Sequence, residues 1–283
     1  MVDAATNLRD FRDYHQPALE QNEARHTLVL AILSSIDQGA MPYGWTLGSP
    51  SQCAVMSPGW PIVLADLEQE QCQRLAEATI QVAYPGVVGP DLTARWFAER
   101  ATELGHAFLD PIPQQIHALS EPPRYPGAPG SARSVAPDDA EVFADWLLAF
   151  NAEATPQDLM PSRERLAKVV TEGRHMFWTV DGEPVSVAGI VRRTRICGSI
   201  GAVYTPPALR GRGYAGSVTA AVVERLFAEG KTTACLYTDL RNPYSNRCYA
   251  KIGFRPICGS LHIPRGGGAV RRTNASKIAR RRD

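Results

Sequence analysis

Hydrophobic and polar positions in the second half of the chain alternate between the periods of helices and of strands. Apolar residues at helical spacing, bounded by capping residues or glycines, predict helices at Pro137–Phe150, from Ser162 to Gly173, at Tyr214–Glu229 and at Pro243–Ile252. Short apolar runs predict strands at Ala132–Val135, His175–Val180, Pro184–Val191, Ile196–Thr205, Thr232–Thr238 and Phe254–Cys258. We therefore expect an α/β (α+β) fold, with a central mixed, mostly antiparallel sheet flanked by helices.

The first half of the chain has a less regular pattern. We expect a helix at Asn22–Ser35, an antiparallel meander of short apolar runs at Gly44–Leu67, and further helices at Glu68–Ile80 and Asp91–Leu104. These elements predict a smaller α/β domain. No group of residues in it is typical of a reaction centre.

A segment rich in proline and glycine, Pro122 to Ser131, separates the two patterns. Such a composition cannot hold a helix or a central strand, so we interpret the segment as a linker. The predicted organisation is an N-terminal domain over residues 1–121, a linker over 122–131, a C-terminal domain over 132–264 and a basic, disordered tail over 265–283.

Charge and composition exclude several classes of protein. The formal net charge is +1, which by itself indicates no polyanionic partner, and nucleic-acid binding is not expected. The basic tail, with a net charge of +6, is typical of a solvated segment. The six cysteines form no Cys-x-x-Cys pair and no ligand-like spacing with histidine, so we expect neither a zinc site nor a disulfide framework.

The sequence has neither of the patterns that direct a chain into or through a membrane. Residues Met1 to Asp10 lack the basic-then-apolar pattern of a signal peptide. The longest strongly apolar stretch, His26 to Ile36, is too short to span a bilayer. We expect a cytoplasmic protein with no membrane partner and no metal.

A glycine-rich turn between a predicted strand and a predicted helix carries the clearest chemical signal. It reads Val203-Tyr-Thr-Pro-Pro-Ala-Leu-Arg-Gly-Arg-Gly-Tyr-Ala-Gly216. The first amides of a helix have no partner within the helix, and the helix dipole adds partial positive charge there. Glycines let the backbone approach a bulky anion, and Arg210 and Arg212 add positive charge. The turn is therefore predicted to bind a diphosphate.

Two nucleotide-binding motifs are alternatives for this turn. Gly211-x-Gly213-x-x-Gly216 matches the dinucleotide fingerprint, and Asp239 lies at a later strand end where a ribose-binding acid is found. In that fold, however, the fingerprint follows the first strand directly, whereas here an antiparallel meander precedes it. A P-loop is excluded because no Gly-Lys-Ser or Gly-Lys-Thr follows the turn.

Two spaced motifs resemble those of the GNAT superfamily of acyl-CoA N-acyltransferases. Arg210-x-x-Gly213-x-Ala215 resembles the pyrophosphate-binding motif. Asn242-x-x-Ser245-x-x-x-Tyr249-x-x-x-Gly253-Phe254 follows at the distance that the family shows. The resemblance covers about Ser131 to Pro264 and implies the GNAT fold. The N-terminal half resembles the degenerate first half of tandem members, although its Tyr84-Pro-Gly86-Val-Val-Gly89 lacks the arginine.

The resemblance also implies roles for individual residues. It places Val203, Tyr204 and Thr205 along the pantetheine arm, Arg210, Gly211, Arg212, Gly213, Tyr214 and Ala215 at the pyrophosphate, and Asn242 and Ser245 along the cofactor. It places Tyr249 at the thioester sulfur, as the general acid. Tyrosine on an amphipathic helix is otherwise usually a core residue, and Asn242 before a proline is otherwise a helix N-cap.

Acyl transfer to an amine also requires that the ammonium lose a proton. At pH 7 this costs about 4–5 kcal/mol for an amine of pKa about 10.4, so a general base or a water chain is needed. Asp239 is the first candidate for the base and Glu183 the second. Cys248 precedes Tyr249, but no histidine lies near it in sequence, so we expect no covalent acyl-enzyme.

These observations lead to one preferred function and one alternative. The preferred function is an N-acetyltransferase that moves an acetyl group directly from acetyl-CoA to a primary amine in a ternary complex. The alternative is a non-catalytic acyl-CoA-binding or sensor module. The acceptor, a small-molecule or peptide amine, and the oligomeric state are left open by the sequence.

Overall fold

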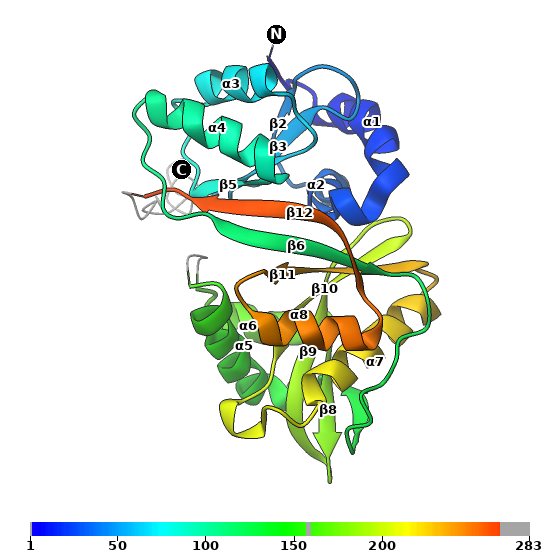
Figure 1. Ribbon diagram of the computed structural model, residues 1–283. Helices are drawn as coiled ribbons and strands as arrows, with labels where there is room; N and C mark the ends of the chain where they lie inside the picture. The colour runs from blue at the N-terminus through cyan, green and yellow to red at the C-terminus, as the bar shows by residue number, and fades with distance from the viewer. Residues whose placement is uncertain (1, 157–159, 267–283) are drawn as a thin grey trace, which may run out of the picture.

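The computed structural model describes residues 2–156 and 160–266 of the chain (Figure 1). The predicted basic tail lies outside the described residues from 267 onward. Figure 1 shows two halves, the N-terminal half above and the C-terminal half below, joined by long strands that cross between them.

Both halves contain the same order of helices and strands. The first half consists of β1 (Asp3–Ala4), α1 (Leu8–Leu19), α2 (Glu23–Ser35), β2 (Tyr43–Thr46), β3 (Cys53–Met56), β4 (Ile62–Leu64), α3 (Gln69–Ala78), β5 (Gly86–Gly89), α4 (Asp91–Glu103) and β6 (Ile112–Leu119). The second consists of β7 (Ser131–Ser134), α5 (Ala140–Ala154), α6 (Arg163–Thr171), β8 (His175–Val180), β9 (Glu183–Arg193), β10 (Cys197–Tyr204), α7 (Tyr214–Ala228), β11 (Thr233–Asp239), α8 (Pro243–Ile252) and β12 (Arg255–Pro264). The chain is thus built as an internal duplication.

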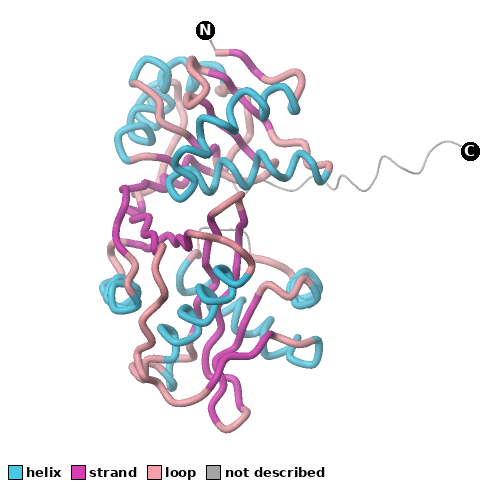
Figure 2. The backbone as a smooth tube through the Cα atoms, turned by 90° about the vertical axis from the view of Figure 1, so that its right-hand side faces the viewer, coloured by secondary structure: helices cyan, strands magenta, loops and turns pink. Residues whose placement is uncertain are grey.

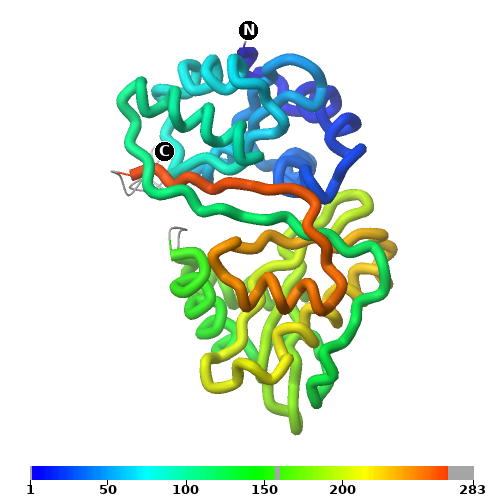
Figure 3. The backbone as a smooth tube through the Cα atoms, viewed as in Figure 1, coloured from blue at the N-terminus to red at the C-terminus, as the bar shows by residue number. Residues whose placement is uncertain are grey.

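The last strands of the two halves are exchanged. All described strands form one sheet in the order β1-β2-β3-β4-β5-β12-β6-β11-β10-β9-β8-β7. Strand β12, from the end of the chain, pairs antiparallel with β5 of the first half, and β6 pairs antiparallel with β11 of the second. Figure 3 shows β12 in red beside β6 in green, between the two halves. Each half therefore completes the sheet of the other.

Helices cover both faces of the sheet in each half, as the lower part of Figure 2 shows for the second half. There, α7 and α8 pack on one face, through a cluster that includes Ile200 and Leu236. Helices α5 and α6 pack on the opposite face, around Phe143 and Phe177. Each sheet face buries its apolar side chains under a helix layer, as expected for a sheet that is covered on both sides.

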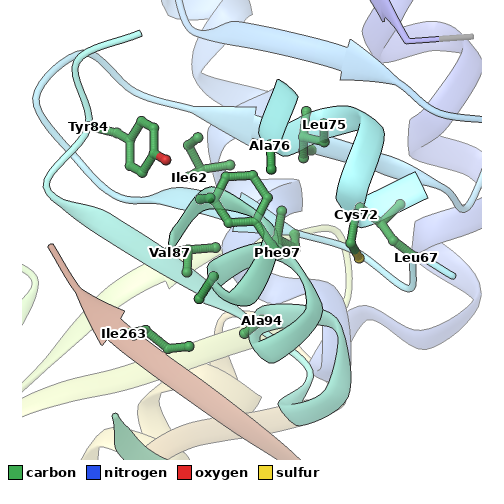
Figure 4. Packing of buried hydrophobic residues seen from close by; sticks show 14 of the residues in the cluster. Ile62, Leu67, Cys72, Leu75, Ala76, Tyr84, Val87, Ala94, Phe97 and Ile263 are labelled. Carbon is green, nitrogen blue, oxygen red and sulfur yellow. The ribbon is translucent and has the colours of Figure 1, made fainter. Parts of the chain in front are cut away.

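The first half has the same layered core, and β12 supplies part of it. Figure 4 shows Ile263 of β12 close to Val87 and Phe97, within the core that α3 and α4 cover. The other face is covered by α1 and α2. Because β12 fills this core, the first half depends on the C-terminal end of the chain for its packing.

The predicted elements of the second half are confirmed to within a few residues, and α8 has the predicted bounds. Strand β12 is longer than the predicted Phe254–Cys258. Helix α1 and strands β1, β5 and β6 were not expected. The proposed boundary at residues 122–131 stays a prediction, although β6, which precedes it, lies between strands of the second half.

Candidate acyl-CoA site

Strands β10 and β11 begin as parallel neighbours and then diverge. Their pairing runs from Cys197↔Thr233 to Ile200↔Leu236 and then stops. Beyond it, β10 bulges relative to β9, and Ala202 adopts a positive φ of 53°. A bulge bends its strand and turns it away from a neighbour. We call the divergence after Ile200 and Leu236 the β10–β11 fork; Val203, Tyr204 and then Thr205 follow it on the β10 side.

The turn after β10 leaves an unusual number of amides without partners. A short 3-10 turn, Pro207–Leu209, is followed by Gly211 and Gly213 at positive φ values of 79° and 86°. Gly213 is the N-cap of α7 and has no side chain with which to cap it. Within the described residues, the backbone N–H groups of residues 211–216 donate no hydrogen bond. Because they gather at the positive end of a helix, these amides have the arrangement that an anion site requires.

The two arginines of the turn differ in how they are held. The Nε of Arg210 donates to the Thr205 carbonyl at 2.9 Å, and its Nη2 reaches the carboxylate of Glu153 on α5 at 2.6 Å. Its guanidinium also lies over the Tyr204 ring. Arg212 is exposed and only contacts the Ala208 carbonyl, at 3.4 Å. Arg210 thus fixes the shape of the turn, and the guanidinium of Arg212 is available to an anion.

The linker packs against this turn, and its packing explains why position 216 is a glycine. A Cβ on Gly216 would lie 2.6 Å from Cγ of Pro126, and one on Gly213 would lie 3.4 Å from Cβ of Ala128. The segment is tied down as well, since the Tyr125 hydroxyl donates to Glu224 at 2.7 Å. Gly216 is therefore required by chain packing. Because packing against Pro126 explains Gly216, this glycine need not be read as part of a dinucleotide fingerprint.

The corresponding turn of the first half lacks this arrangement. Residues 65–68 between β4 and α3 contain no glycine, and the amide of Glu68 donates to the side chain of Gln71 at 2.9 Å. Asp66, Glu68 and Glu70 place acidic groups at this end of α3. Their charge opposes a phosphate group, so only the α7 turn has the chemistry of a diphosphate site.

The side chains of Asn242 and Ser245 both form hydrogen bonds with the backbone at the start of α8. The Asn242 Oδ1 accepts from the amides of Tyr244 and Ser245, each at 3.2 Å. The Ser245 hydroxyl donates to the Asn242 carbonyl at 3.1 Å. The structure thus gives Asn242 the capping role that the sequence also allowed, and its contact with a cofactor stays a prediction.

Tyr249 projects from α8 into the core of the second half. It is buried, its ring meets that of Phe254 edge-on at 6.1 Å, and burial raises the pKa of its phenol. Its hydroxyl makes no hydrogen bond within the described residues. A phenol with a raised pKa keeps its proton at neutral pH and can donate it to a stronger base.

The two base candidates have different surroundings. The Asp239 carboxylate accepts from the backbone N–H of Arg241 and from its guanidinium, both at 2.8 Å. Burial opposes ionisation of Asp239, but the contacts with Arg241 outweigh it and lower the pKa. Glu183 is exposed at the start of β9, opposite Val180 in the hairpin. Asp239 is thus a paired and weakened base, and both assignments stay predictions.

Two groups near the fork had no signal in the sequence. His117 of β6 contacts the Thr238 hydroxyl at 3.2 Å, and Arg192 of β9 lies over the ring of Tyr237, 5.8 Å from its centre. Neither residue belongs to a sequence motif. Each lies on a strand, β6 or β9, that comes close to the fork only because of its position in the folded sheet.

Comparison with known proteins identifies the fold. Residues 179–262 match a family model described as FR47-like protein. Over 87% of this chain and 97% of the other, the structure is similar to a GCN5-related N-acetyltransferase from Kribbella flavida, with 16% identity and a TM-score of 0.59. A Drosophila protein matches over 92% of this chain and 90% of its own, with 15% identity and a TM-score of 0.62.

A third similar structure is a tandem GNAT protein from the clavulanic acid biosynthesis pathway. The match covers 95% of this chain and 100% of the other, with 11% identity and a TM-score of 0.55. No curated protein matches in sequence. The predicted fold class is confirmed, and the fold is similar to that of GNAT proteins, one of them a tandem GNAT protein.

Residues 2–156 and 160–266 contain neither a candidate membrane span nor a candidate metal site. None of the helices there has both the length and the apolar character needed to span a bilayer. Nor do three His, Cys, Asp or Glu side chains of these residues come together as a possible metal site.

Proposed function

We propose that this chain, which has the GNAT fold and matches the FR47-like family over residues 179–262, is an acyltransferase that moves an acetyl group from acetyl-CoA to a primary amine. The observation that carries the proposal is the uncapped, glycine-flanked start of α7 next to the β10–β11 fork. It combines an anion site with an unpaired strand edge, the two features that a diphosphate followed by an extended arm requires.

The cofactor contacts follow from this arrangement. The diphosphate lies at the amides of residues 211–216, where each hydrogen bond to the charged acceptor contributes roughly 1.5–3 kcal/mol. Arg212 adds charge from the solvent side, and Arg210 holds the turn in place. The pantetheine arm lies along Val203 to Thr205. The start of α8, at Asn242 and Ser245, flanks it.

The reaction proceeds in one displacement. The amine nitrogen attacks the thioester carbonyl carbon, and the C–S bond breaks as the new C–N bond forms. The departing thiolate takes the phenolic proton of Tyr249, and the amine loses its own proton to a base. Asp239 is our candidate for that base, although it must first loosen its contact with Arg241.

A covalent intermediate on Cys248, the cysteine that precedes Tyr249 on α8, is disfavoured by the protonation state of its thiol. Burial raises the pKa of Cys248, so the thiol stays protonated and is a weak nucleophile. The raised pKa supports direct transfer in a ternary complex.

The test is to measure binding and turnover separately. In thermal unfolding, CoA at 100 times its dissociation constant should add about 2.7 kcal/mol to the unfolding free energy, whereas NADPH should add nothing. A panel of primary amines with acetyl-CoA should then release free thiol. If the folded protein binds neither CoA nor acetyl-CoA, the proposal is wrong.

The pairing of Asp239 with Arg241 favours a second candidate, a non-catalytic acyl-CoA-binding module. In that case CoA stabilises the protein, but no amine releases thiol above the rate of buffer hydrolysis. Asp239→Asn separates the two functions further. It lowers turnover if Asp239 is the base, and it leaves CoA binding unchanged in either case.

A further inference from the structure

The sheet face opposite α7 and α8 carries a polar group next to the fork. The pairings Ser199↔Arg192 and Ser199↔Cys235 place these three residues side by side, and Tyr237 follows Cys235 on the same face. Ile200 and Leu236, the alternate residues, belong to the core under α7 and α8. Strand alternation thus turns Arg192 and Tyr237 away from the diphosphate site.

Among the described residues, Arg192 has no counter-ion of the kind that Arg193 and Arg195 have. Within residues 2–156 and 160–266, no carboxylate lies within 4 Å of its guanidinium, which is half-buried. It lies over the Tyr237 ring and makes one long contact, 3.5 Å, with the Ser199 hydroxyl. By contrast, the next residue, Arg193, pairs with Glu229 at 3.1 Å. A partly desolvated guanidinium without a partner attracts an anion strongly.

This guanidinium lies beside the place where the proposed reaction occurs. Tyr237 is the first residue of β11 beyond the last pair with β10, so it borders the fork. Its hydroxyl also makes no hydrogen bond within the part of the chain that the structure describes. A thioester lying in the fork has α7 and α8 on one side and the Arg192–Tyr237 pair on the other.

We propose that the acceptor amine also carries a carboxylate, which Arg192 and the Tyr237 hydroxyl bind on this face of the sheet. The inference rests on the proposed function and names its substrate class. A guanidinium presents parallel N–H donors that match the two oxygens of a carboxylate. One arginine and one hydroxyl suit a single negative charge, whereas a dianionic phosphate group would call for more donors.

The surroundings define how the acceptor enters. On the side of the first half, α2 closes over Tyr237 and leaves a cavity of only about 30 Å³, lined by Val29, Ile116 and Tyr237 among others. This is room for about one water molecule. Val191, next to Arg192, is 37% exposed. The carboxylate therefore reaches Arg192 from the side of Val191.

Asp239, once its contact with Arg241 has loosened, completes a complementary pair of charges. It follows Tyr237 by two residues and so projects from the same face, about 7 Å further along β11. An acceptor whose amine lies near Asp239 and whose carboxylate lies near Arg192 meets opposite charges at both ends. This favours short amino acids over amines without an acidic group.

The experiment compares matched acceptors that differ only in the carboxylate, 4-aminobutyrate against butylamine and tyrosine against tyramine. In the unaltered protein, kcat/KM for thiol release should be at least 10-fold higher for the carboxylated member. Arg192→Gln should remove this ratio and leave the dissociation constant of CoA within 2-fold. Arg193→Gln, which loses a surface pair, is the matched control and should keep the ratio.

A binding measurement keeps the inference testable if turnover is absent. With CoA present, 4-aminobutyrate should raise the melting temperature more than butylamine does, and Arg192→Gln should abolish the difference. Tyr237→Phe, which keeps the ring, should reduce it in part. Equal effects of both amines in the unaltered protein overturn the inference, whereas failure of CoA to bind overturns the proposed function instead.

Discussion

At the scale of single residues, Tyr249 combines a buried ring with a hydroxyl that is free to donate. Most buried tyrosines place the hydroxyl against a partner, as Tyr84 does with His106 at 2.9 Å. The Tyr249 hydroxyl has none within the described residues, although its ring is buried. A hydroxyl that keeps its proton and has no protein partner meets the requirement for the proposed general acid.

Replacing Tyr249 with phenylalanine should therefore affect chemistry more than structure. We expect kcat to fall about 100-fold or more, the typical contribution of a general acid, with CoA affinity nearly unchanged. Thiol-release kinetics and calorimetric titration with CoA measure the two effects. Tyr244→Phe on the same helix is the control, because Tyr244 is 77% exposed. Equal activity of both variants would rule out Tyr249 as the acid.

At the scale of elements, the two helices that follow β4 and β10 differ in how they begin. Helix α3 starts at acidic residues, with the Glu68 amide bound by Gln71, whereas α7 starts at a glycine that leaves its amides open. The same position in the duplicated fold is thus closed to anions in one half and open in the other. The difference lies in a few residues of the turn.

Gly213 and Gly230 form a matched pair for testing the α7 turn. Both have positive φ, 86° and 84°, at opposite ends of α7. Alanine at either position should cost about 1 kcal/mol of unfolding free energy, because the left-handed conformation is strained for a residue with a Cβ. Only Gly213→Ala should also weaken CoA binding, by 10-fold or more. Denaturant titration and calorimetry measure these effects, and equal CoA affinity in both variants would contradict the assignment of the turn.

At the scale of the whole molecule, exchanged strands and one buried carboxylate join the two halves. Glu23 of α2 has a side chain that is 1% exposed and reaches the β9–β10 hairpin. Its Oε2 accepts from the Thr194 hydroxyl at 2.6 Å and from the amides of Ile196 and Cys197 at 2.8 and 3.1 Å. These contacts hold α2 against the sheet of the second half.

Removing this carboxylate should loosen the joint. We expect Glu23→Ala to cost about 3 kcal/mol, because two backbone amides lose a charged acceptor and stay buried. Glu20→Ala, which removes a surface contact with Arg195, should cost less than about 1 kcal/mol. Urea titration of both variants measures the difference. Equal costs would mean that Glu23 does not hold the halves together.

The histidines predict how stability depends on pH. Burial lowers the pKa of all six, to about 4 for His175 and His262. At His175 and His262, the unfolded chain therefore binds protons below pH 6.5 that the folded protein does not accept until about pH 4. Stability should be greatest above pH 6.5 and should fall by roughly 3 kcal/mol for each of these two residues as pH approaches 4.

Urea titrations between pH 7.5 and pH 4.5 measure this slope. Replacing His175 and His262 with glutamine should flatten it, since glutamine takes up no proton. A slope that persists unchanged in the double variant would mean that other groups cause the acid sensitivity.

Much of the second half could be predicted from its sequence, because local signals there agree with the final structure. Asn242 before Pro243 marks the start of α8 and Gly253 its end, and the predicted bounds are those observed. Strand β6 could not be predicted from its sequence, Ile-Pro-Gln-Gln-Ile-His-Ala-Leu. It has a proline and no strict alternation, and it is a strand because β11 and β12 pair with it on both sides.

The amino-acid sequence by itself determined the helices of the second half, the tight hairpin between β8 and β9 and the glycine-rich turn, since caps, periodicity and positive φ act over a few residues. Only the tertiary structure decided that β6 and β12 change places, that Arg210 is paired with Glu153, and that Arg192 meets Tyr237 beside the fork. Those contacts join residues far apart in the chain or on different elements. They depend on how strands are ordered in the sheet, which short-range patterns do not encode.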